Sequence, residues 1–265
     1  MADGTTPQDK KVAIVTGGAS GIGASIASAL LAEGFEVFVL DITVPDTPEP
    51  ASLAECRMLA CDISDSEAVA STIEAICSAT SRVDLLVNNV GISGPTATVE
   101  DIAIEAWQET IDTNLNAMFY VTKAVIPLMK AQRDGVIVNM ASNAGLFGCP
   151  NRSPYAASKW AVIGLTKTWA MELGPFNIRV NALCPASVSG PRIEGVIERD
   201  AQARGVTPEA VREVYERQSS LRRFTNVEDI ASMICYLAGT GGARISGQAI
   251  ALDGNTETLA NWLDP

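Results

Sequence analysis

The sequence predicts a single α/β domain built on a doubly wound parallel sheet with helices on both faces. Short apolar runs alternate with longer segments of helical spacing. The short runs are apolar at nearly every position, which is typical of strands that are covered on both faces. No linker divides the 265 residues, of which 47% are hydrophobic. We expect a flexible tail at residues 1–10 and one domain over residues 11–265.

The expected strands are short, and a turn signal or a helical pattern follows each of them. They are residues 12–15, 37–40, 57–61, 83–87, 135–139, 178–183 and 249–252. Apolar residues recur at helical spacing between the strands, most clearly at 21–33, 66–79, around 114–130 and at 155–173. This alternation predicts parallel strands that are joined by crossover helices.

One segment interrupts this rhythm after the sixth strand. Residues 186–226 carry mixed charges, two short helical patterns and the breakers Gly190, Pro191, Gly205 and Pro208. A long insertion at the end of a strand is where α/β proteins place binding loops. We therefore expect a substrate loop or lid over this segment.

The composition excludes several classes of function. Asp and Glu number 31 against 19 Lys and Arg, and the net charge of -12 argues against nucleic acid or anionic lipid as a partner. The chain has no histidine, which excludes Ser-His-Asp and Cys-His mechanisms and any metal site that needs imidazole. We expect no metal, and acid–base chemistry must use Tyr, Lys, Cys, Asp or Glu.

The cysteines and the N-terminus indicate a reducing compartment. The 6 cysteines lie far apart and form no C-x-x-C pair, which favours reduced side chains over disulfides or zinc ligands. The first residues are polar and lack the apolar core of a secretory signal. No apolar run approaches the ~20 residues that span a bilayer. The sequence predicts a soluble, cytoplasmic protein without a membrane partner.

The segment TGGASGIG, residues 16–23, separates the first strand from the first helix. Glycines there permit a tight turn and let a pyrophosphate approach the N–H groups at the positive end of the helix. The spacing differs from the general G-x-G-x-x-G fingerprint, and a purely structural turn is the alternative. The candidate cofactor contacts are Gly17, Ser20, Gly21, Ile22 and Gly23.

Two carboxylates at strand ends extend the dinucleotide hypothesis. Asp41 ends the second strand, where it can accept hydrogen bonds from the adenosine ribose and would repel a 2′-phosphate. No basic residue stands at Ala19 or Ser20 to attract that phosphate, so NAD is the expected cofactor. Asp62, with Ile63, follows the third strand and is placed to meet the adenine, although a helix N-cap is an alternative role for it.

Tyr155 and Lys159 stand at i and i+4 in YAASK and share one face of a helix. The reference pKa of tyrosine, near 10, is about three units too high for a base at neutral pH. A positive charge ~4 Å away contributes on the order of 4 kcal/mol at an effective dielectric of ~20, and one pKa unit is ~1.4 kcal/mol. Lys159, helped by an oxidised nicotinamide, is therefore sufficient to bring the phenol towards neutrality.

Several motifs, in order along the chain, resemble those of the short-chain dehydrogenase/reductase family in its single-domain form. They are residues 16–23, NNVG at 88–91, Asn114, Ser142 and the Tyr155-x-x-x-Lys159 pair. The similarity extends from about Lys11 to Gly254. It implies a Rossmann-like fold and hydride transfer between NAD(H) and a secondary alcohol or ketone.

The resemblance also implies a role for each site residue. Tyr155 would be the catalytic acid/base, and Ser142 would hold the substrate oxygen. Lys159 would bind the nicotinamide ribose and lower the pKa of Tyr155, and Asn114 would position a water that relays the proton from Lys159. Further cofactor contacts are implied for Asn89, Gly91 and Val188.

The chain departs from the family pattern after the sixth strand. Ala186 follows Pro185 where many members have glycine, and Gly190 stands where a threonine touches the nicotinamide amide. Ser187 or Ser189 could substitute for that threonine, and the sequence does not choose between them.

Three rival functions have specific objections. An NADPH-dependent 3-oxoacyl-carrier-protein-type reductase conflicts with Asp41. Halohydrin-dehalogenase-like lyases lose the cofactor glycines and the lysine, and this chain keeps both. A non-catalytic binding or regulatory member would have no reason to retain Asn114, Ser142, Tyr155 and Lys159.

The substrate and the assembly are the least determined features. Leu146, Phe147, Cys149, Arg152 and the segment 187–224 are expected to shape the pocket for a small alcohol or ketone. Arg152 and Arg192 could recognise an anionic or polyhydroxylated substrate, or could instead lie on the surface or in a subunit contact. The resemblance implies a homotetramer. Four apolar residues could form its contacts or could be intramolecular core: Trp160, Val162, Trp169 and Met171.

Overall fold

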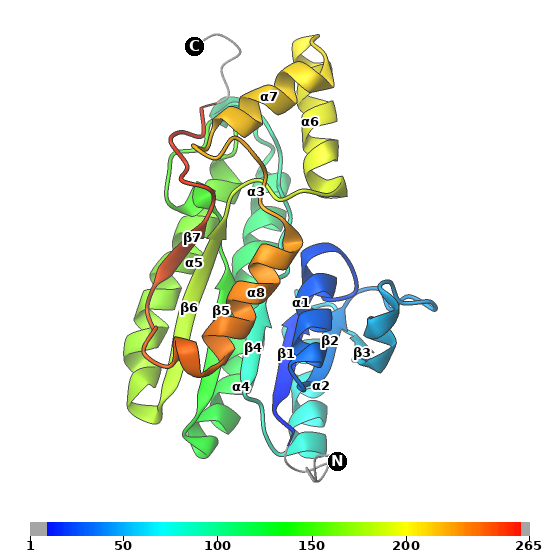
Figure 1. Ribbon diagram of the computed structural model, residues 1–265, viewed down its shortest axis with the longest axis vertical. Helices are drawn as coiled ribbons and strands as arrows, with labels where there is room; N and C mark the ends of the chain where they lie inside the picture. The colour runs from blue at the N-terminus through cyan, green and yellow to red at the C-terminus, as the bar shows by residue number, and fades with distance from the viewer. Residues whose placement is uncertain (1–9, 261–265) are drawn as a thin grey trace.

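Apolar runs that are buried on both sides produce a seven-stranded parallel sheet, with the order β3-β2-β1-β4-β5-β6-β7 (Figure 1). A computed structural model describes residues 10–260. The strands are β1 (Val12–Thr16), β2 (Glu36–Asp41), β3 (Arg57–Ala60), β4 (Leu85–Asn88), β5 (Gly135–Met140), β6 (Ile178–Pro185) and β7 (Ala249–Leu252). Every predicted strand is present, with bounds within two residues of those expected. The expected tail, apart from Lys10, lies outside the described residues.

The described chain has eight α-helices. They are α1 (Gly21–Ala32), α2 (Ser66–Thr80), α3 (Ile104–Ile111), α4 (Ala117–Gln132), α5 (Ser153–Leu173), α6 (Pro191–Arg204), α7 (Pro208–Arg217) and α8 (Val227–Ala238). Of these, α1, α2, α4, α5 and α8 pack on the two faces of the sheet. Helix α2 begins at a capping residue, because the Asp65 carboxylate accepts from the amides of Glu67 and Ala68. The alternative role of Asp62 as the N-cap is therefore wrong.

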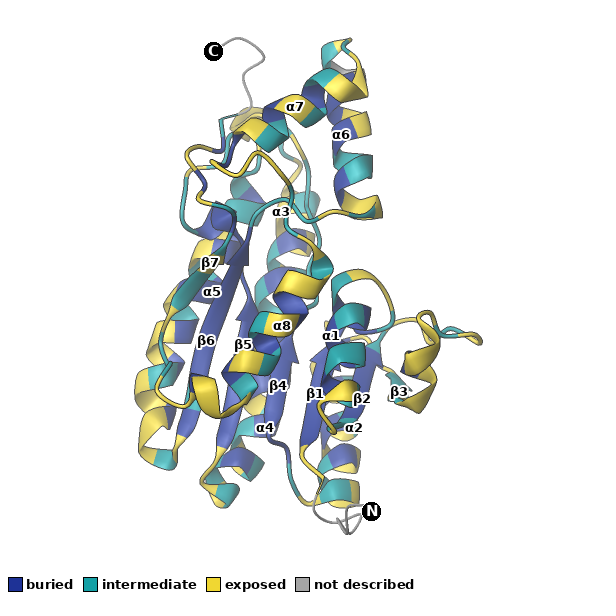
Figure 2. Ribbon diagram, viewed as in Figure 1, coloured by how far each residue is buried: buried dark blue, intermediate teal, exposed yellow. Residues whose placement is uncertain are grey.

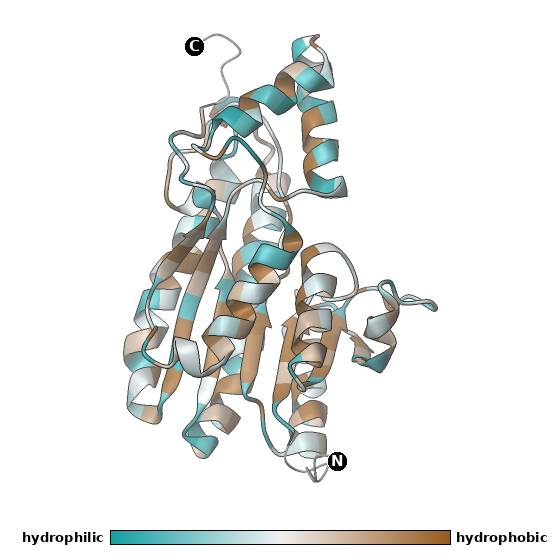
Figure 3. Cartoon of the chain, viewed as in Figure 1, coloured by the Kyte–Doolittle hydropathy of each residue, from teal (hydrophilic) through white to brown (hydrophobic). Residues whose placement is uncertain are grey.

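The core has two layers, one on each face of the sheet. Alternation along β1 places Ile14 in the layer under α2, α4 and α5, and Val15 in the layer under α1 and α8. Figure 2 shows the central strands β1, β4, β5 and β6 buried between these helices, and Figure 3 shows that these strands are largely hydrophobic. The doubly wound parallel fold predicted from the sequence is confirmed.

Two details of the helices differ from expectation. The helix expected around residues 114–130 is continuous with α3 through a π-helical segment, Asp112–Asn116. Trp160 and Met171 are 53% and 81% exposed, but Val162 and Trp169 are buried in the sheet core. The suggestion that Val162 and Trp169 belong to a subunit contact is therefore wrong, because their positions on α5 face the strands.

The segment 186–226 forms the two expected short helices, α6 and α7, which stand above the carboxyl ends of the strands (Figure 1). They bury a small cluster of their own that includes Ile197 and Val211, and an ion pair between Glu194 and Arg212 also joins them. Backbone hydrogen bonds between Thr225 and residues 187 and 189, each 2.9 Å, close the base of the segment beside Val188.

The described chain has no membrane-spanning helix, no metal-binding cluster and no disulfide. No helix of residues 10–260 is long and apolar enough to cross a membrane. Within the same residues, no cluster of acidic, cysteine or histidine side chains could hold a metal ion. All six cysteines are free.

Candidate active site

The strand order reverses between β1 and β4, because β2 and β3 lie on one side of β1 and the later strands lie on the other. Open parallel sheets bind ligands at such a point, outside the carboxyl ends of the strands. The glycine-rich segment follows β1, Asp41 ends β2, and Asn89 follows β4. The fold therefore brings these predicted residues to one edge of the sheet.

The glycine-rich turn after β1 is held closed by Asn89. Its side-chain amide donates to the carbonyl oxygens of Thr16 at 3.0 Å and Gly17 at 3.1 Å. Gly17 has a φ of +63°, in the left-handed region. A Cβ on Gly23 would lie 2.0 Å from the Gly17 carbonyl oxygen. The turn therefore needs glycine at both positions, for conformation at the first and for close approach at the second.

The N-terminus of α1 is suited to an anion. Ser20 occupies the N-cap without a side-chain capping bond, and the first turn carries no acidic residue. A Cβ on Gly21 would meet no heavy atom within 4 Å, so the backbone is accessible there. Ile22 packs partly against the core, which leaves its amide rather than its side chain for a ligand. Such helix ends bind phosphate groups, and these residues fit the pyrophosphate of a dinucleotide.

Asp41 is tied to this turn. Its Oδ2 accepts from the amide of Ala19 at 3.1 Å, and its Oδ1 accepts from the amide of Thr43 at 3.4 Å. The carboxylate therefore stands at the edge of the glycine-rich turn, where the adenosine ribose of a dinucleotide would lie. No lysine or arginine occupies residues 17–23 or 42–44 to balance its charge.

Asp62 and Ile63 lie beyond β3. The amide and hydroxyl of Ser64 donate to Asp62 Oδ1 at 2.9 and 2.7 Å, and these bonds hold the pKa of Asp62 below its ordinary value. The Ile63 side chain is buried in the core. A contact between Ile63 and a cofactor would therefore have to use the backbone.

Asn114 is buried in the π-helical segment, a distortion that is common at functional sites. Its Oδ1 accepts from the amide of Ile92 at 2.7 Å, and its Nδ2 donates to the Ile92 carbonyl at 3.0 Å and to Ser158 Oγ at 3.2 Å. A Cβ on Gly91 would lie 3.1 Å from Asn114 Oδ1 and 3.3 Å from Lys159 Nζ. Asn114 thus ties the loop after β4 to α5 beside Lys159.

Lys159 is buried, with 4% of its surface exposed. Its Nζ donates to the Met140 carbonyl at 2.8 Å and lies 5.6 Å from the centroid of the Tyr155 ring. Ser142 begins the short helix Asn143–Gly145, where its Oγ accepts from the amide of Ala144 at 3.2 Å. The end of β5 and the first turns of α5 therefore bring Ser142, Tyr155 and Lys159 together.

The charges around Tyr155 favour its ionised form. Burial raises the pKa of the phenol, but the charges of Lys159 and Arg192, a hydrogen bond from Ser142 and the charge of Arg152 outweigh burial. The net pKa of Tyr155 lies below its ordinary value. Such an arrangement can move a proton at the phenol oxygen near neutral pH.

Lys159 and Cys184 respond to the same burial in different ways. Burial lowers the pKa of Lys159, and the charge of Arg192 lowers it further, against the opposing effects of Tyr155 and Cys184. Burial raises the pKa of the Cys184 thiol, at the end of β6, to about 11. Cys184 therefore stays a neutral thiol and is a poor alternative base.

Three contacts in the site were not predicted from the sequence, although Arg152 itself was expected to shape the pocket. Ser158 connects Asn114 to the Tyr155 carbonyl, to which its hydroxyl donates at 2.7 Å. Thr256 accepts from the Asn143 side chain at 3.2 Å, which links the residue after Ser142 to the segment that follows β7. Arg152 lies over the Tyr155 ring, 5.2 Å from its centroid. The position of Ser158 in the same helix turn as Lys159 could have indicated its place in the site. The other two contacts depend on tertiary structure and could not have been predicted from the sequence.

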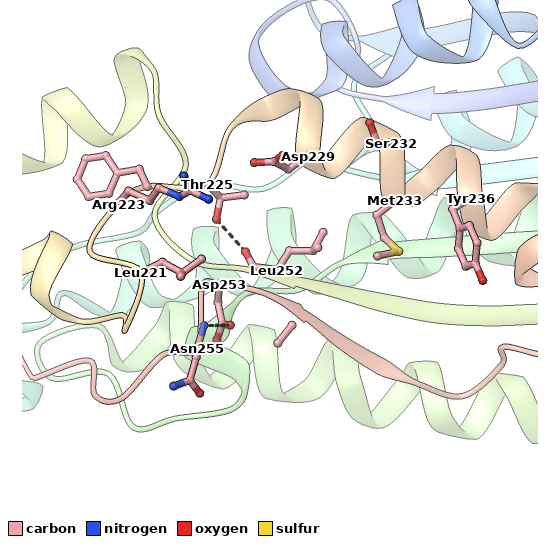
Figure 4. Close-up of a pocket in the computed structure, with 13 residues that line it drawn as sticks. Leu221, Arg223, Thr225, Asp229, Ser232, Met233, Tyr236, Leu252, Asp253 and Asn255 are labelled. Atoms are coloured by element: carbon pink, nitrogen blue, oxygen red, sulfur yellow. Dashed lines mark hydrogen bonds between the residues drawn. The ribbon is translucent and has the colours of Figure 1, made fainter.

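The structure also contains a pocket of about 680 Å³ (Figure 4). It is bounded by the end of the inserted segment, by α8 and by the residues that follow β7. Thr225 and Leu252 both line it, and the Thr225 hydroxyl donates to the Leu252 carbonyl at 2.8 Å. None of the residues predicted to bind a cofactor or to catalyse a reaction lines this pocket.

A family model described as short chain dehydrogenase matches residues 11–201. The chain is also 35% identical over 252 residues to D-beta-hydroxybutyrate dehydrogenase of Rhizobium meliloti (strain 1021). That alignment covers 92% of this chain and 97% of the relative. Sequence similarity therefore extends over nearly the whole domain.

Two solved structures have the same fold. NAD+-bound xylitol dehydrogenase superposes with a TM-score of 0.88 and 31% identity, covering 94% of this chain and all 100% of the other. An actinorhodin polyketide ketoreductase with NADPH superposes with a TM-score of 0.87 and 33% identity, covering 97% and 100%. Both forms of the nicotinamide cofactor therefore occur among similar structures. The chain belongs to the short-chain dehydrogenase/reductase family of oxidoreductases, which act on CH–OH and keto groups with a nicotinamide cofactor.

Proposed function

We propose that this protein is an NAD-dependent oxidoreductase that interconverts a secondary alcohol and its ketone, with Tyr155 as the acid/base. The observation that carries this proposal is the buried Lys159 beside a tyrosine whose pKa is lowered by neighbouring cations. When bound, the cofactor supplies the hydride acceptor or donor. The protein residues supply the proton transfer and the orientation of the substrate.

In alcohol oxidation, the ionised Tyr155 oxygen accepts the hydroxyl proton of the substrate. The Ser142 hydroxyl holds the substrate oxygen as it becomes a carbonyl, and Lys159 stabilises the phenolate. In ketone reduction the same phenol donates its proton to the developing alkoxide. Asn114 holds the loop after β4 beside Lys159, and a water placed there that relays the proton stays a prediction.

NAD is proposed over NADP because of Asp41. A 2′-phosphate near the glycine-rich turn would meet a carboxylate that already accepts from the Ala19 amide, without a cation in that turn to offset it. The rival function is an NADPH-dependent ketoreductase of the 3-oxoacyl-carrier-protein type, favoured by the likeness to the polyketide ketoreductase with NADPH. Asp41 argues against this rival.

We further propose that the protein is a homotetramer in the cytoplasm and that α6 and α7 act as a lid over the substrate. Support for the assembly is the exposure of Trp160 and Met171 on α5. Support for the lid is the position of α6 and α7 above the carboxyl ends of the strands (Figure 1). We also propose that Val188 contacts the carboxamide group of the bound nicotinamide.

The test of this function is Tyr155→Phe, measured by NADH absorbance on a panel of secondary alcohols. The substitution removes the proton carrier and keeps the ring, so turnover should fall to less than a few per cent of wild type, while NADH binding persists. Tyr236→Phe is the matched control, because Tyr236 is exposed on α8 and its hydroxyl should not matter. Substantial turnover by Tyr155→Phe would show that another group is the base.

A further inference from the structure

Arg152 has an unusual environment for an arginine in this chain. It occupies the N-cap of α5 and is half-buried, with its guanidinium 5.2 Å from the centroid of the Tyr155 ring. Its Nη2 donates to the Ser93 carbonyl at 2.8 Å. The side chain is thus fixed beside the proposed acid/base by a backbone carbonyl on one side and an aromatic ring on the other.

The Arg152 guanidinium has one neutral acceptor, the Ser93 carbonyl, and no acidic partner in the described chain. Its Nε is buried without a hydrogen-bond partner, and Arg152 makes no ion pair with any residue between 10 and 260. A buried donor without a hydrogen-bond partner lowers the stability of the folded state. The chain has 12 more acidic than basic residues, so a carboxylate could readily have been placed there. The positive charge of Arg152 therefore has no acidic counterpart within residues 10–260.

The neighbours of Arg152 leave its positive charge uncompensated. Burial raises the pKa of the Cys149 thiol and of the Tyr215 phenol, and the charge of Arg152 opposes that rise at both groups. Both groups are therefore neutral near pH 7. Asp200 acts on the same tyrosine; its Oδ1 is paired with Arg204 at 2.6 Å, and its buried Oδ2 makes no hydrogen bond in the described chain.

A second arginine approaches the site from the inserted segment. Arg192 lies in the first turn of α6 and, in the described part of the chain, has no ion-pair partner. Its charge acts on both Tyr155 and Lys159. Arg152, before α5, lies over the Tyr155 ring, and Arg192, at the start of α6, adds a second positive charge that acts on the same phenol.

We propose that Arg152, assisted by Arg192, binds a carboxylate of the substrate, so that the substrates are hydroxy acids and the corresponding keto acids. A guanidinium matches the planar, singly charged carboxylate through paired N–H donors. The pairing would give Arg152 an anionic partner through its Nη groups and hold the alcohol carbon next to Tyr155. This inference depends on the proposed oxidoreductase function and names its substrate class.

The activity test compares acids with their neutral methyl esters. The probes are 2-hydroxybutyrate, 3-hydroxybutyrate and 4-hydroxycyclohexanecarboxylate, each paired with its ester, with NAD+ or NADP+. For the best pair, kcat/KM should favour the acid by about 100-fold, as expected for a charge-assisted pair. Arg152→Met should remove most of that preference through the KM of the acid, and Arg152→Lys should keep part of it. Arg244→Gln, which removes one exposed charge elsewhere, should leave the preference unchanged.

A binding test does not depend on turnover. Butyrate titrated into the NADH complex should change NADH fluorescence saturably, whereas the neutral isostere butyramide should not, and Arg152→Met should abolish the butyrate response. Thermal melting and NADH affinity show that the variant is folded. Equal use of acids and esters, an unchanged preference in Arg152→Met, or tighter binding of methyl phosphate than of butyrate would overturn the carboxylate assignment. If no alcohol or acid were oxidised with either cofactor, the proposed function would fail, and the butyrate titration would still decide the role of Arg152.

Discussion

Burial by itself would move the pKa of Tyr155 upward, away from the range in which a phenol acts as a base near pH 7. The positive charges of Lys159, Arg192 and Arg152 and the Ser142 hydrogen bond reverse that direction. Lys159 is itself buried and donates to the Met140 carbonyl, which keeps its charge beside the ring. The reactivity of one phenol therefore depends on side chains from the segment between β5 and α5, from α5 itself and from the inserted segment.

Ser142 and Lys159 should differ in what they contribute. Ser142→Ala keeps the acid and removes one donor to the substrate oxygen, so kcat should fall by about 10²–10³. Lys159→Ala should be nearly as damaging as Tyr155→Phe and should also weaken NADH binding. Because the three side chains act on one proton and one oxygen, the double variant Ser142→Ala/Tyr155→Phe should be little worse than Tyr155→Phe. Steady-state rates and NADH fluorescence measure both effects, and additive losses would contradict the shared role.

Asp41 should set the cofactor preference. The wild-type protein should have a much higher kcat/KM with NAD+ than with NADP+, because a 2′-phosphate would face the carboxylate. Asp41→Ala should bring the two kcat/KM values closer together, because it weakens the binding of NAD+ and removes the repulsion of the 2′-phosphate of NADP+. Glu74→Ala, an exposed charge on α2, is the matched control and should change neither value. Comparable efficiency with both cofactors in the wild type would refute this assignment.

At the scale of elements, the turn after β1 connects local sequence to function most directly. Its shape depends on the left-handed φ of Gly17, on the absence of a side chain at Gly23 and on the two bonds from Asn89. The glycine spacing predicted this turn because conformation and close approach are local requirements. The π-helical segment around Asn114 was not predicted, because its bonds to Ile92 and Ser158 come from distant parts of the chain.

Gly23→Ala should therefore abolish NADH binding or prevent folding of the turn. A Cβ would stand 2.0 Å from the Gly17 carbonyl oxygen, and that backbone atom cannot move away without distorting the turn. Gly195→Ala in α6 is the control, because its Cβ would meet only the mobile end of Arg199 at 3.3 Å. The control should stabilise the protein by roughly 0.5–1 kcal/mol, as alanine does in a helix. Thermal melting and NADH titration distinguish the two, and normal NADH affinity in Gly23→Ala would contradict the role given to this turn.

For the whole molecule, the pattern of buried strands was sufficient to predict the sheet and its covered faces. The same pattern could not say which apolar helix residues face outward: Val162 and Trp169 contact the core, whereas Trp160 and Met171 do not. It also could not place Arg152 over Tyr155, since a surface position and a position in the site look alike in one sequence. The features that stayed hidden are those that depend on contacts between distant segments.

The exposed apolar residues of α5 should be covered in the assembled protein. Light scattering at micromolar concentration should give four times the 27.8 kDa mass of the chain. Met171→Glu combined with Trp160→Glu should lower that mass, because two buried charges oppose association, while Glu172→Gln should not. A monomeric wild-type protein would count decisively against the tetramer.

The pH dependence of alcohol oxidation tests the central claim, that Tyr155 is a base activated by neighbouring cations. The phenol accepts a proton only when it is ionised, so kcat/KM should fall as the pH falls through its apparent pKa. Because the pKa of Tyr155 is lowered from its ordinary value of 10.0, the rate should rise through a single transition with a midpoint below that value. In ketone reduction the trend should reverse, since the protonated phenol is then the reactive form. A midpoint at or above the ordinary tyrosine value, or a rate independent of pH, would contradict the account.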